Sequence, residues 1–213
     1  MRYIYLFICT FISFASGSPG FAAPTLDDMF KAVKANDVSE LRSYLDQGMD
    51  PNSTSKEGYS VLMEAAREGH VEVVELLLDR KAKVNQQNAV GETALMLAAF
   101  KGHLGTVRLL HRRGAELKGS GWTALHYAAF QGSVPVAKYL LDNKADVNAK
   151  APNGITPLMS AVRNSHEDVV KLLLAQGADP NLKADTGASA LQWALKSGNT
   201  DIAQLLKQAG AKE

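Results

Sequence analysis

The chain has 213 residues, enough for one domain or two, and its 46% hydrophobic and 21% charged residues are typical of a globular protein. Lys and Arg (23) nearly balance Asp and Glu (22), which disfavours a nucleic-acid-binding protein because phosphate binding needs a clustered positive excess. The single cysteine, Cys9, excludes a disulfide framework, a cysteine-rich zinc site and an iron–sulfur cluster.

Residues 1–22 have the order of a secretory signal peptide. Arg2 precedes an apolar stretch from Tyr3 to Ala15, and the small residues Gly20 and Ala22 predict cleavage after Ala22. A helix of that stretch would reach about 20 Å, less than the roughly 30 Å hydrocarbon core of a bilayer, so no stable membrane span is expected. A buried N-terminal helix is the alternative, but a core helix would be amphipathic. The remaining chain lacks cysteine, which suits the periplasm or secretion.

The next part of the chain repeats one pattern. Five glycines recur at steps of 33, 30, 33 and 33 residues, and each is followed at fixed distances by a hydroxyl, a leucine and an alanine. In the first copy these residues are Ser60, Leu62 and Ala65, and the glycines are Gly58, Gly91, Gly121, Gly154 and Gly187. Because all five copies keep this register, they are tandem repeats of one supersecondary unit.

Each copy predicts two short helices joined by a turn. The hydroxyl, as in Ser60, is placed to cap the first helix, and a glycine such as Gly69 ends it where the backbone needs a positive φ. The second helix carries apolar residues at helical spacing, as in Val71, Val74 and Leu77. An extended loop follows, and no segment is long enough for a central strand. The predicted fold class is therefore all-α.

Three segments resemble the repeats of the ankyrin family: GETALMLAAFKGHLGTVRLLHRRGAEL, GWTALHYAAFQGSVPVAKYLLDNKADVNAK and GITPLMSAVRNSHEDVVKLLLAQGADPNLK. The resemblance covers residues 26–213 and implies a solenoid of about six helix–turn–helix units with short hairpin fingers. Behind a signal peptide at 1–22 we expect an ankyrin repeat domain at 23–213. Its parts would be an N-terminal cap at 26–56, repeats at 57–89, 90–119, 120–152 and 153–185, and a C-terminal cap at 186–213. The 30-residue step predicts one shortened finger, between Gly114 and Trp122.

No catalytic, cofactor or metal site is predicted. His70, His103 and His166 share one register, and repeats about 10 Å apart cannot bring such a ladder around one ion. The resemblance implies that these histidines are structural, with each ring bonding the backbone across the turn, and that His126, at the family's T-P-L-H position, is structural too. Nucleophile-elbow, dinucleotide-binding and P-loop motifs are absent from the sequence, so we expect no enzyme activity and no cofactor.

The resemblance also implies where a partner would bind, namely the concave surface formed by the fingers and first helices. The variable positions there flank each finger glycine and precede each helix-ending glycine. In the sixth unit they are Ala188, Lys196 and Ser197. The predicted partner-binding residues are those of the other units: Tyr59, Arg67, Glu68, Glu92, Phe100, Lys101, Trp122, Phe130, Gln131, Ile155, Arg163 and Asn164. Aromatic and arginine side chains dominate many interfaces, so we expect the aromatics and Ile155 to form one exposed patch. The alternative is that each aromatic folds back onto its own repeat.

The function that the resemblance implies is a non-catalytic protein–protein interaction module, a binding scaffold in the bacterial envelope. We expect a monomer that binds another protein and no nucleic acid. One alternative is an inhibitor or immunity protein for a toxin or enzyme, which a strongly charged concave face would favour. Another, by resemblance to some periplasmic ankyrin proteins, is an accessory factor in catalase-linked peroxide tolerance. The rival class is an enzyme, which turnover in a hydrolase screen would support.

Overall fold

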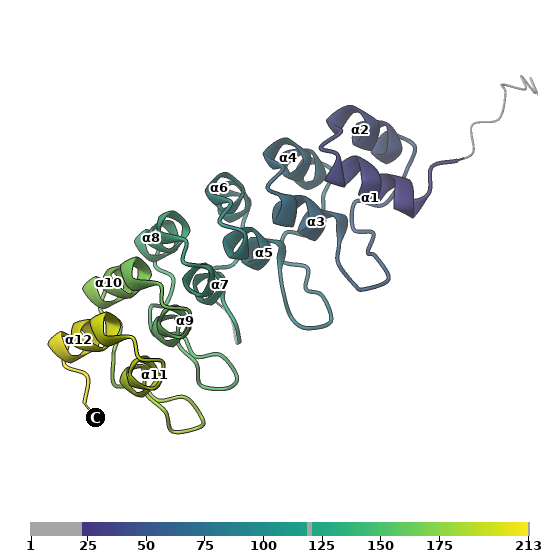
Figure 1. The fold of residues 1–213 in the computed structure, drawn as a ribbon. Helices are drawn as coiled ribbons and strands as arrows, with labels where there is room; N and C mark the ends of the chain where they lie inside the picture. Colours follow the sequence, from purple (N-terminus) through teal and green to yellow (C-terminus); the bar gives the residue numbers. More distant parts are fainter. Residues whose placement is uncertain (1–22, 119–120, 213) are drawn as a thin grey trace, which may run out of the picture.

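The computed structural model describes residues 23–118 and 121–212, and the expected signal peptide lies outside them. None of the helices in these ranges is long and apolar enough to cross a membrane. Twelve helices in this part of the chain form six successive pairs (Figure 1). We number these pairs as the first to the sixth unit: α1 Leu26–Lys34 and α2 Val38–Asp46, α3 Val61–Glu68 and α4 Val71–Asp79, α5 Ala94–Phe100 and α6 Leu104–Arg112, α7 Ala124–Gln131 and α8 Val134–Asp142, α9 Pro157–Arg163 and α10 Glu167–Ala175, and α11 Ala190–Lys196 and α12 Thr200–Gln208.

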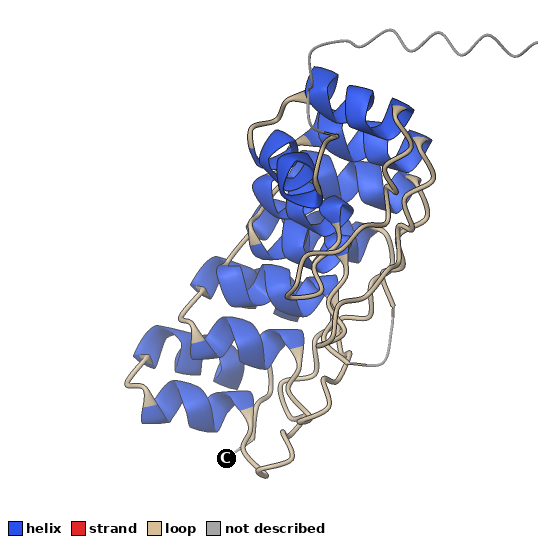
Figure 2. Cartoon of the chain, turned by 90° about the vertical axis from the view of Figure 1, so that its right-hand side faces the viewer, coloured by secondary structure: helices blue, strands red, loops and turns tan. Residues whose placement is uncertain are grey.

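The helices lie in two layers. Each odd-numbered helix contacts the next odd-numbered helix, each even-numbered helix contacts the next even-numbered one, and the two helices of each pair contact each other. Long loops, the fingers, project to one side from the odd-numbered layer (Figures 1 and 2). Strand-like pairing in the described ranges is limited to two isolated antiparallel bridges, Thr54–Ser60 and Lys183–Ser189. The structure confirms the predicted all-α solenoid, while the shortened finger includes residues 119 and 120, which lie outside the described ranges.

The first helices begin where the hydroxyl register predicts. The Ser60 hydroxyl accepts a hydrogen bond from the Met63 backbone N–H at 3.2 Å, and Thr156 does the same for a later unit. The first unit has no finger glycine, and α1 is capped instead by Thr25, which forms a capping box with Asp28. Hydrogen bonds from the Thr25 hydroxyl and backbone N–H lower the pKa of Asp28 to about 2. Each cap satisfies N–H groups that the helix itself leaves without a partner.

One continuous core runs through the stack. A leucine in each second helix from α4 onward is fully buried, and these leucines belong to one cluster with the small alanines of the first helices. The leucines are Leu77, Leu110, Leu140, Leu173 and Leu206. Because each unit buries its apolar side against its neighbours, the units stabilise one another as stacked layers.

Asparagine side chains tie successive units together on the loop side. Each accepts a hydrogen bond from a backbone N–H in the next unit, at 2.8 Å for Asn52 and Lys83 and at 3.0 Å for Asn85 and Glu116. Asn148 and Asn181 repeat the contact with Asp179 and Lys212. The step from the third to the fourth unit differs, because Lys118 stands at the position of the asparagine. Its ammonium group cannot accept a hydrogen bond from a backbone N–H.

The histidine ladder is structural, but its bonds run between units. The Nε2 atoms of His70, His103 and His166 lie 2.9–3.1 Å from backbone carbonyl oxygens of the preceding unit, those of Lys34, Arg67 and Phe130. The rings bond the backbone as expected, and the carbonyl that each ring contacts belongs to the preceding unit. The reason is the close approach of neighbouring turns: a Cβ on Gly132 would lie 2.5 Å from His166 Nδ1.

Candidate partner-binding surface

The surface formed by the fingers and the odd-numbered helices, here called the finger face, carries most of the predicted binding residues. Five of them are exposed: Glu68, Lys101, Phe130, Gln131 and Arg163. Six are half-buried: Tyr59, Arg67, Glu92, Phe100, Trp122 and Asn164. The predicted residues thus lie in two places: at the C-terminal ends of α3, α5, α7 and α9, and in the finger segments just before these helices.

The prediction of an exposed Ile155 is wrong. Its side chain is only 7% exposed and belongs to the core cluster, while its carbonyl oxygen lies 3.0 Å from His126 Nε2. The finger enters α9 through Gly154, which is itself buried, so the residue after that glycine turns inward. Asn164 has a local role as well, because its amide donates to the Ser160 carbonyl near the end of α9 at 2.9 Å.

Four aromatic side chains form a continuous row, here called the aromatic ridge: Trp122, Tyr127, Phe100 and Phe130. Ring centroids are 5.8 Å apart for Trp122 and Tyr127, and 6.1 Å apart both for Phe100 and Tyr127 and for Phe100 and Phe130. These separations are those of favourable aromatic pairs. Phe130 remains 37% exposed, and the Lys101 ammonium lies 5.6 Å from the centre of the Phe100 ring.

Sequence reasoning missed Tyr127, the ring that joins the row. The variable positions implied by the resemblance do not include it, yet it contacts both Phe100 and Trp122. A signal was available, because Tyr127 precedes Phe130 by three residues on the same helix and the two therefore share a face. A search for aromatic residues three or four positions before each predicted aromatic residue would have found Tyr127.

Glu92 connects three units beside the ridge. Its carboxylate accepts hydrogen bonds from the Tyr127 hydroxyl at 2.9 Å, from the Asn88 amide at 2.8 Å and from the Tyr59 hydroxyl at 3.4 Å. Burial and the bond to Glu92 raise the pKa of Tyr127, so its hydroxyl stays a donor. Tyr59 therefore reaches the ridge through Glu92, which joins the second, third and fourth units on the finger face.

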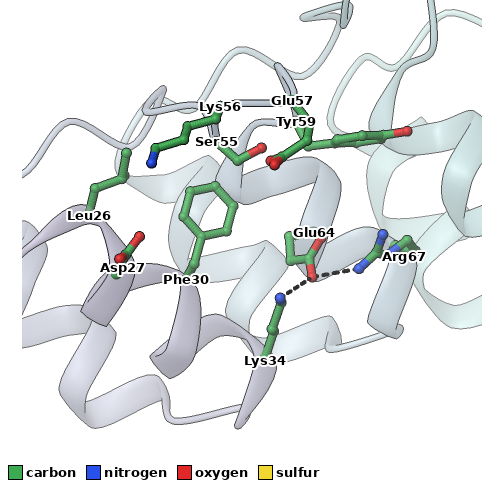
Figure 3. Close-up of a pocket in the computed structure, with 10 residues that line it drawn as sticks. All are labelled: Leu26, Asp27, Phe30, Lys34, Ser55, Lys56, Glu57, Tyr59, Glu64 and Arg67. Carbon is green, nitrogen blue, oxygen red and sulfur yellow. Dashed lines mark hydrogen bonds and ion pairs between the residues drawn. The ribbon is translucent and has the colours of Figure 1, made fainter.

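A second feature of the finger face is a cavity of about 490 Å³ between α1, α3 and the first finger (Figure 3). Phe30 and Tyr59 supply its aromatic surface, and Glu64 lies at its base. Glu64 is only 4% exposed, and its carboxylate lies 2.7 Å from Arg67 and 3.5 Å from Lys34. The predicted residues Tyr59 and Arg67 line this cavity, whereas Glu64 was not predicted because it is not one of the variable positions that the resemblance implied.

No group of three or more His, Cys, Asp or Glu side chains suited to a metal ion occurs in residues 23–118 and 121–212. His126 is fully buried and bonded within the protein, and burial lowers its pKa to about 4. The finger face presents aromatic and charged side chains, such as Phe130 and Lys101.

Comparisons with known proteins agree with this architecture. The family model "Ankyrin repeats (3 copies)" matches residues 29–119, 81–151 and 148–213. A segment of 49 residues is 53% identical to "Fibronectin type 3 and ankyrin repeat domains 1 protein" of Mus musculus, covering 22% of this chain and 14% of that protein. A segment of 50 residues is 44% identical to "Potassium channel AKT3" of Oryza sativa subsp. japonica, covering 24% of this chain and 6% of that protein.

The chain thus spans only a small part of either relative. Among solved structures, the human ASB11 ankyrin repeat domain superposes with a TM-score of 0.80 and 27% identity, over 86% of this chain and 84% of that one. Ankyrin repeats are binding modules for other proteins, typically without catalytic activity, and none of these comparisons indicates an enzyme family. With a family model that matches nearly all of the described residues, the chain belongs to the ankyrin repeat family.

Proposed function

We propose that the chain is a non-catalytic binding scaffold whose protein partner docks on the aromatic ridge of the finger face. The observation that carries the proposal is the ridge itself. Its four rings touch in sequence across the third and fourth units, and Phe130 at its end is 37% exposed. The other three rings are half-buried, and a partly exposed row of aromatic rings is the kind of apolar patch that marks an interaction site.

The surroundings of the ridge suit an interface. Lys101 and Gln131 are exposed beside Phe100 and Phe130, and Arg163 is exposed at the end of the next first helix. Aromatic anchors within a rim of polar and charged side chains are the usual composition of an energetically important interface centre. The even-numbered layer on the other side presents exposed charged side chains such as Glu72 and Lys171, the second of which pairs with Glu167.

The test compares two pairs of variants in capture of a partner from an envelope extract. Phe130→Ala and Trp122→Ala should weaken capture by about 2 kcal/mol or more, roughly thirtyfold. Glu72→Ala and Lys171→Ala, in α4 and α10, should change affinity by less than about 0.5 kcal/mol. Loss of capture in the α4 and α10 variants with full capture in the aromatic ones would place the partner on the even-numbered helices instead.

We further propose that the mature protein acts as a monomer in the bacterial envelope, the periplasm or the exterior. The support is the order of charged, apolar and small residues in the segment 1–22. Intact-mass measurement of protein recovered from the envelope should give a chain that begins at Ala23. Recovery of the uncleaved chain from the cytoplasm would contradict this location. The molar mass from light scattering tests whether the protein is a monomer. The inhibitor and peroxide-tolerance roles stay predictions.

A further inference from the structure

A second cavity on the finger face, of about 370 Å³, lies beside the aromatic ridge. Trp122 and Tyr127 form aromatic walls, and Met96 adds an apolar, polarisable one. Glu92, Glu116 and Lys118 are the charged residues of its lining, so the lining has a formal charge of −1. An anionic cavity with aromatic walls is complementary to a cation.

The Glu92 carboxylate has capacity for a further donor. A carboxylate offers about four acceptor positions, and three neutral donors use three of them, one at the long distance of 3.4 Å. No Lys, Arg or His in the described ranges forms an ion pair with Glu92, although nine other ion pairs occur there. The charge of Glu92 therefore has neutral partners and no cationic one in this part of the chain.

Stacking of the units does not explain a carboxylate at this position. The residue directly after the finger glycine is Tyr59, Trp122, Ile155 or Ala188 in the other units, all of them uncharged. Bonds that join neighbouring units need an acceptor, which a neutral amide would supply as well. A half-buried charge adds a desolvation cost to the free protein, and a cation that binds beside it would offset that cost.

We propose that this cavity binds an arginine side chain of the protein partner. The guanidinium group would donate to the free position on Glu92 while its plane stacks on Trp122 or Tyr127. Arginine fits better than lysine, because the guanidinium is planar, more weakly hydrated and able to bond and stack at once. The inference rests on the proposed function, since it names one contact of the partner on the same face.

The probe is a blocked tripeptide, acetyl-Gly-Arg-Gly-amide, titrated into the isotope-labelled protein and followed by NMR. Its matched control replaces arginine with citrulline, which keeps the shape and loses the charge. We expect the arginine peptide to shift the Trp122 indole signal and to bind at least about tenfold more tightly than the citrulline peptide. The preference should shrink when salt rises from about 0.05 M to about 0.5 M. Trp193→Phe assigns the two indole signals.

Glu92→Gln should remove the preference for arginine while the far-ultraviolet circular dichroism and the Trp193 signal stay unchanged. Glu72→Gln, the same change on exposed α4, should leave both affinities within about twofold of those of the unaltered protein. Equal affinity for the two peptides, no binding at millimolar concentration, or a preference that survives Glu92→Gln would each overturn the proposal. Shifts confined to the cavity at Glu64 would overturn it as well.

Partner capture separates this inference from the proposed function. Capture that depends on Phe130 and is unchanged by Glu92→Gln would leave the aromatic ridge as the docking surface and reject the arginine contact. Capture that is unchanged by Phe130→Ala, together with a Glu92-dependent arginine preference, would reject the ridge and retain the cavity.

Discussion

Acid should destabilise the folded protein through one buried side chain, His126, in the fourth unit. Its Nδ1 atom accepts from the Thr123 backbone N–H at 3.2 Å, and its Nε2 atom lies 3.0 Å from the Ile155 carbonyl oxygen. This network assigns the neutral tautomer with hydrogen on Nε2. The ring thus closes the capping box of α7 and also ties the fourth unit to the finger of the fifth.

The size of the effect follows from the difference between the folded and unfolded pKa values. Burial lowers the pKa of His126 from 6.5 to about 4 in the folded state. Between these values the unfolded chain binds a proton that the folded chain does not. The contribution of neutral His126 to the free energy of unfolding is therefore fully present above pH 6.5 and falls as the pH is lowered toward 4. At about 1.4 kcal/mol for each pH unit, the loss is about 2 kcal/mol at pH 5 and about 3 kcal/mol at pH 4.

Urea unfolding between pH 8 and pH 4, followed by helical circular dichroism, measures this loss against a His126→Gln variant. The sixth unit supplies the precedent for glutamine, because Gln192 accepts from the Ser189 backbone N–H at 3.0 Å in the same register. At pH 8 the variant should be about 1 kcal/mol less stable than the unaltered protein, because its bond to the Ile155 carbonyl is lengthened or missing. Its stability should fall about 2 kcal/mol less than that of the unaltered protein between pH 7 and pH 5.

Equal losses of stability in the two proteins over this range would refute the reasoning. An NMR titration that gives His126 a pKa near 6.5 in the folded protein would refute it independently, because burial would then not lower the pKa of the ring.

Four further substitutions test the stacking of the units. Leu140→Ala should cost about 2–5 kcal/mol in urea unfolding, and Leu206→Ala less, since only one unit covers the last helix pair, although both leucines are fully buried. Lys118→Asn should raise stability by about 0.5–1.5 kcal/mol if it supplies the missing asparagine contact between the third and fourth units. Gly132→Ala should cost about 1–2 kcal/mol from its φ of +79° alone, and more because the added Cβ displaces His166, which a thermal melt measures.

The fold could be predicted from the sequence because five of the units repeat the same local signals. Ser60 and its equivalents mark the starts of the first helices, and the leucine spacing identifies Leu77 and Leu110 as core residues. These signals act within a few residues of chain, where hydroxyl caps and helical periodicity are decided. Five copies in one register then make stacking the expected arrangement.

Contacts between units were harder to predict, because no single repeat contains both partners. The ring of His103 bonds the Arg67 carbonyl 36 positions earlier, whereas the sequence alone named no partner for the ring. Ile155 turns inward for a similar reason, since the finger that carries it passes over His126 of the preceding unit. The direction of these side chains depends on how closely two neighbouring units approach.

Departures from the repeat pattern gather where the third and fourth units meet. Glu92 is charged where other units are not, Trp122 places the largest side chain in the finger register, and Lys118 replaces the asparagine that joins neighbouring units. The finger between these units is also three residues shorter than the others. A stack of identical layers requires none of these three residues, and all three line one cavity. Local choices that disagree with the fold mark functional sites more often than chance would, so the surface between these two units is where the partner should be sought first.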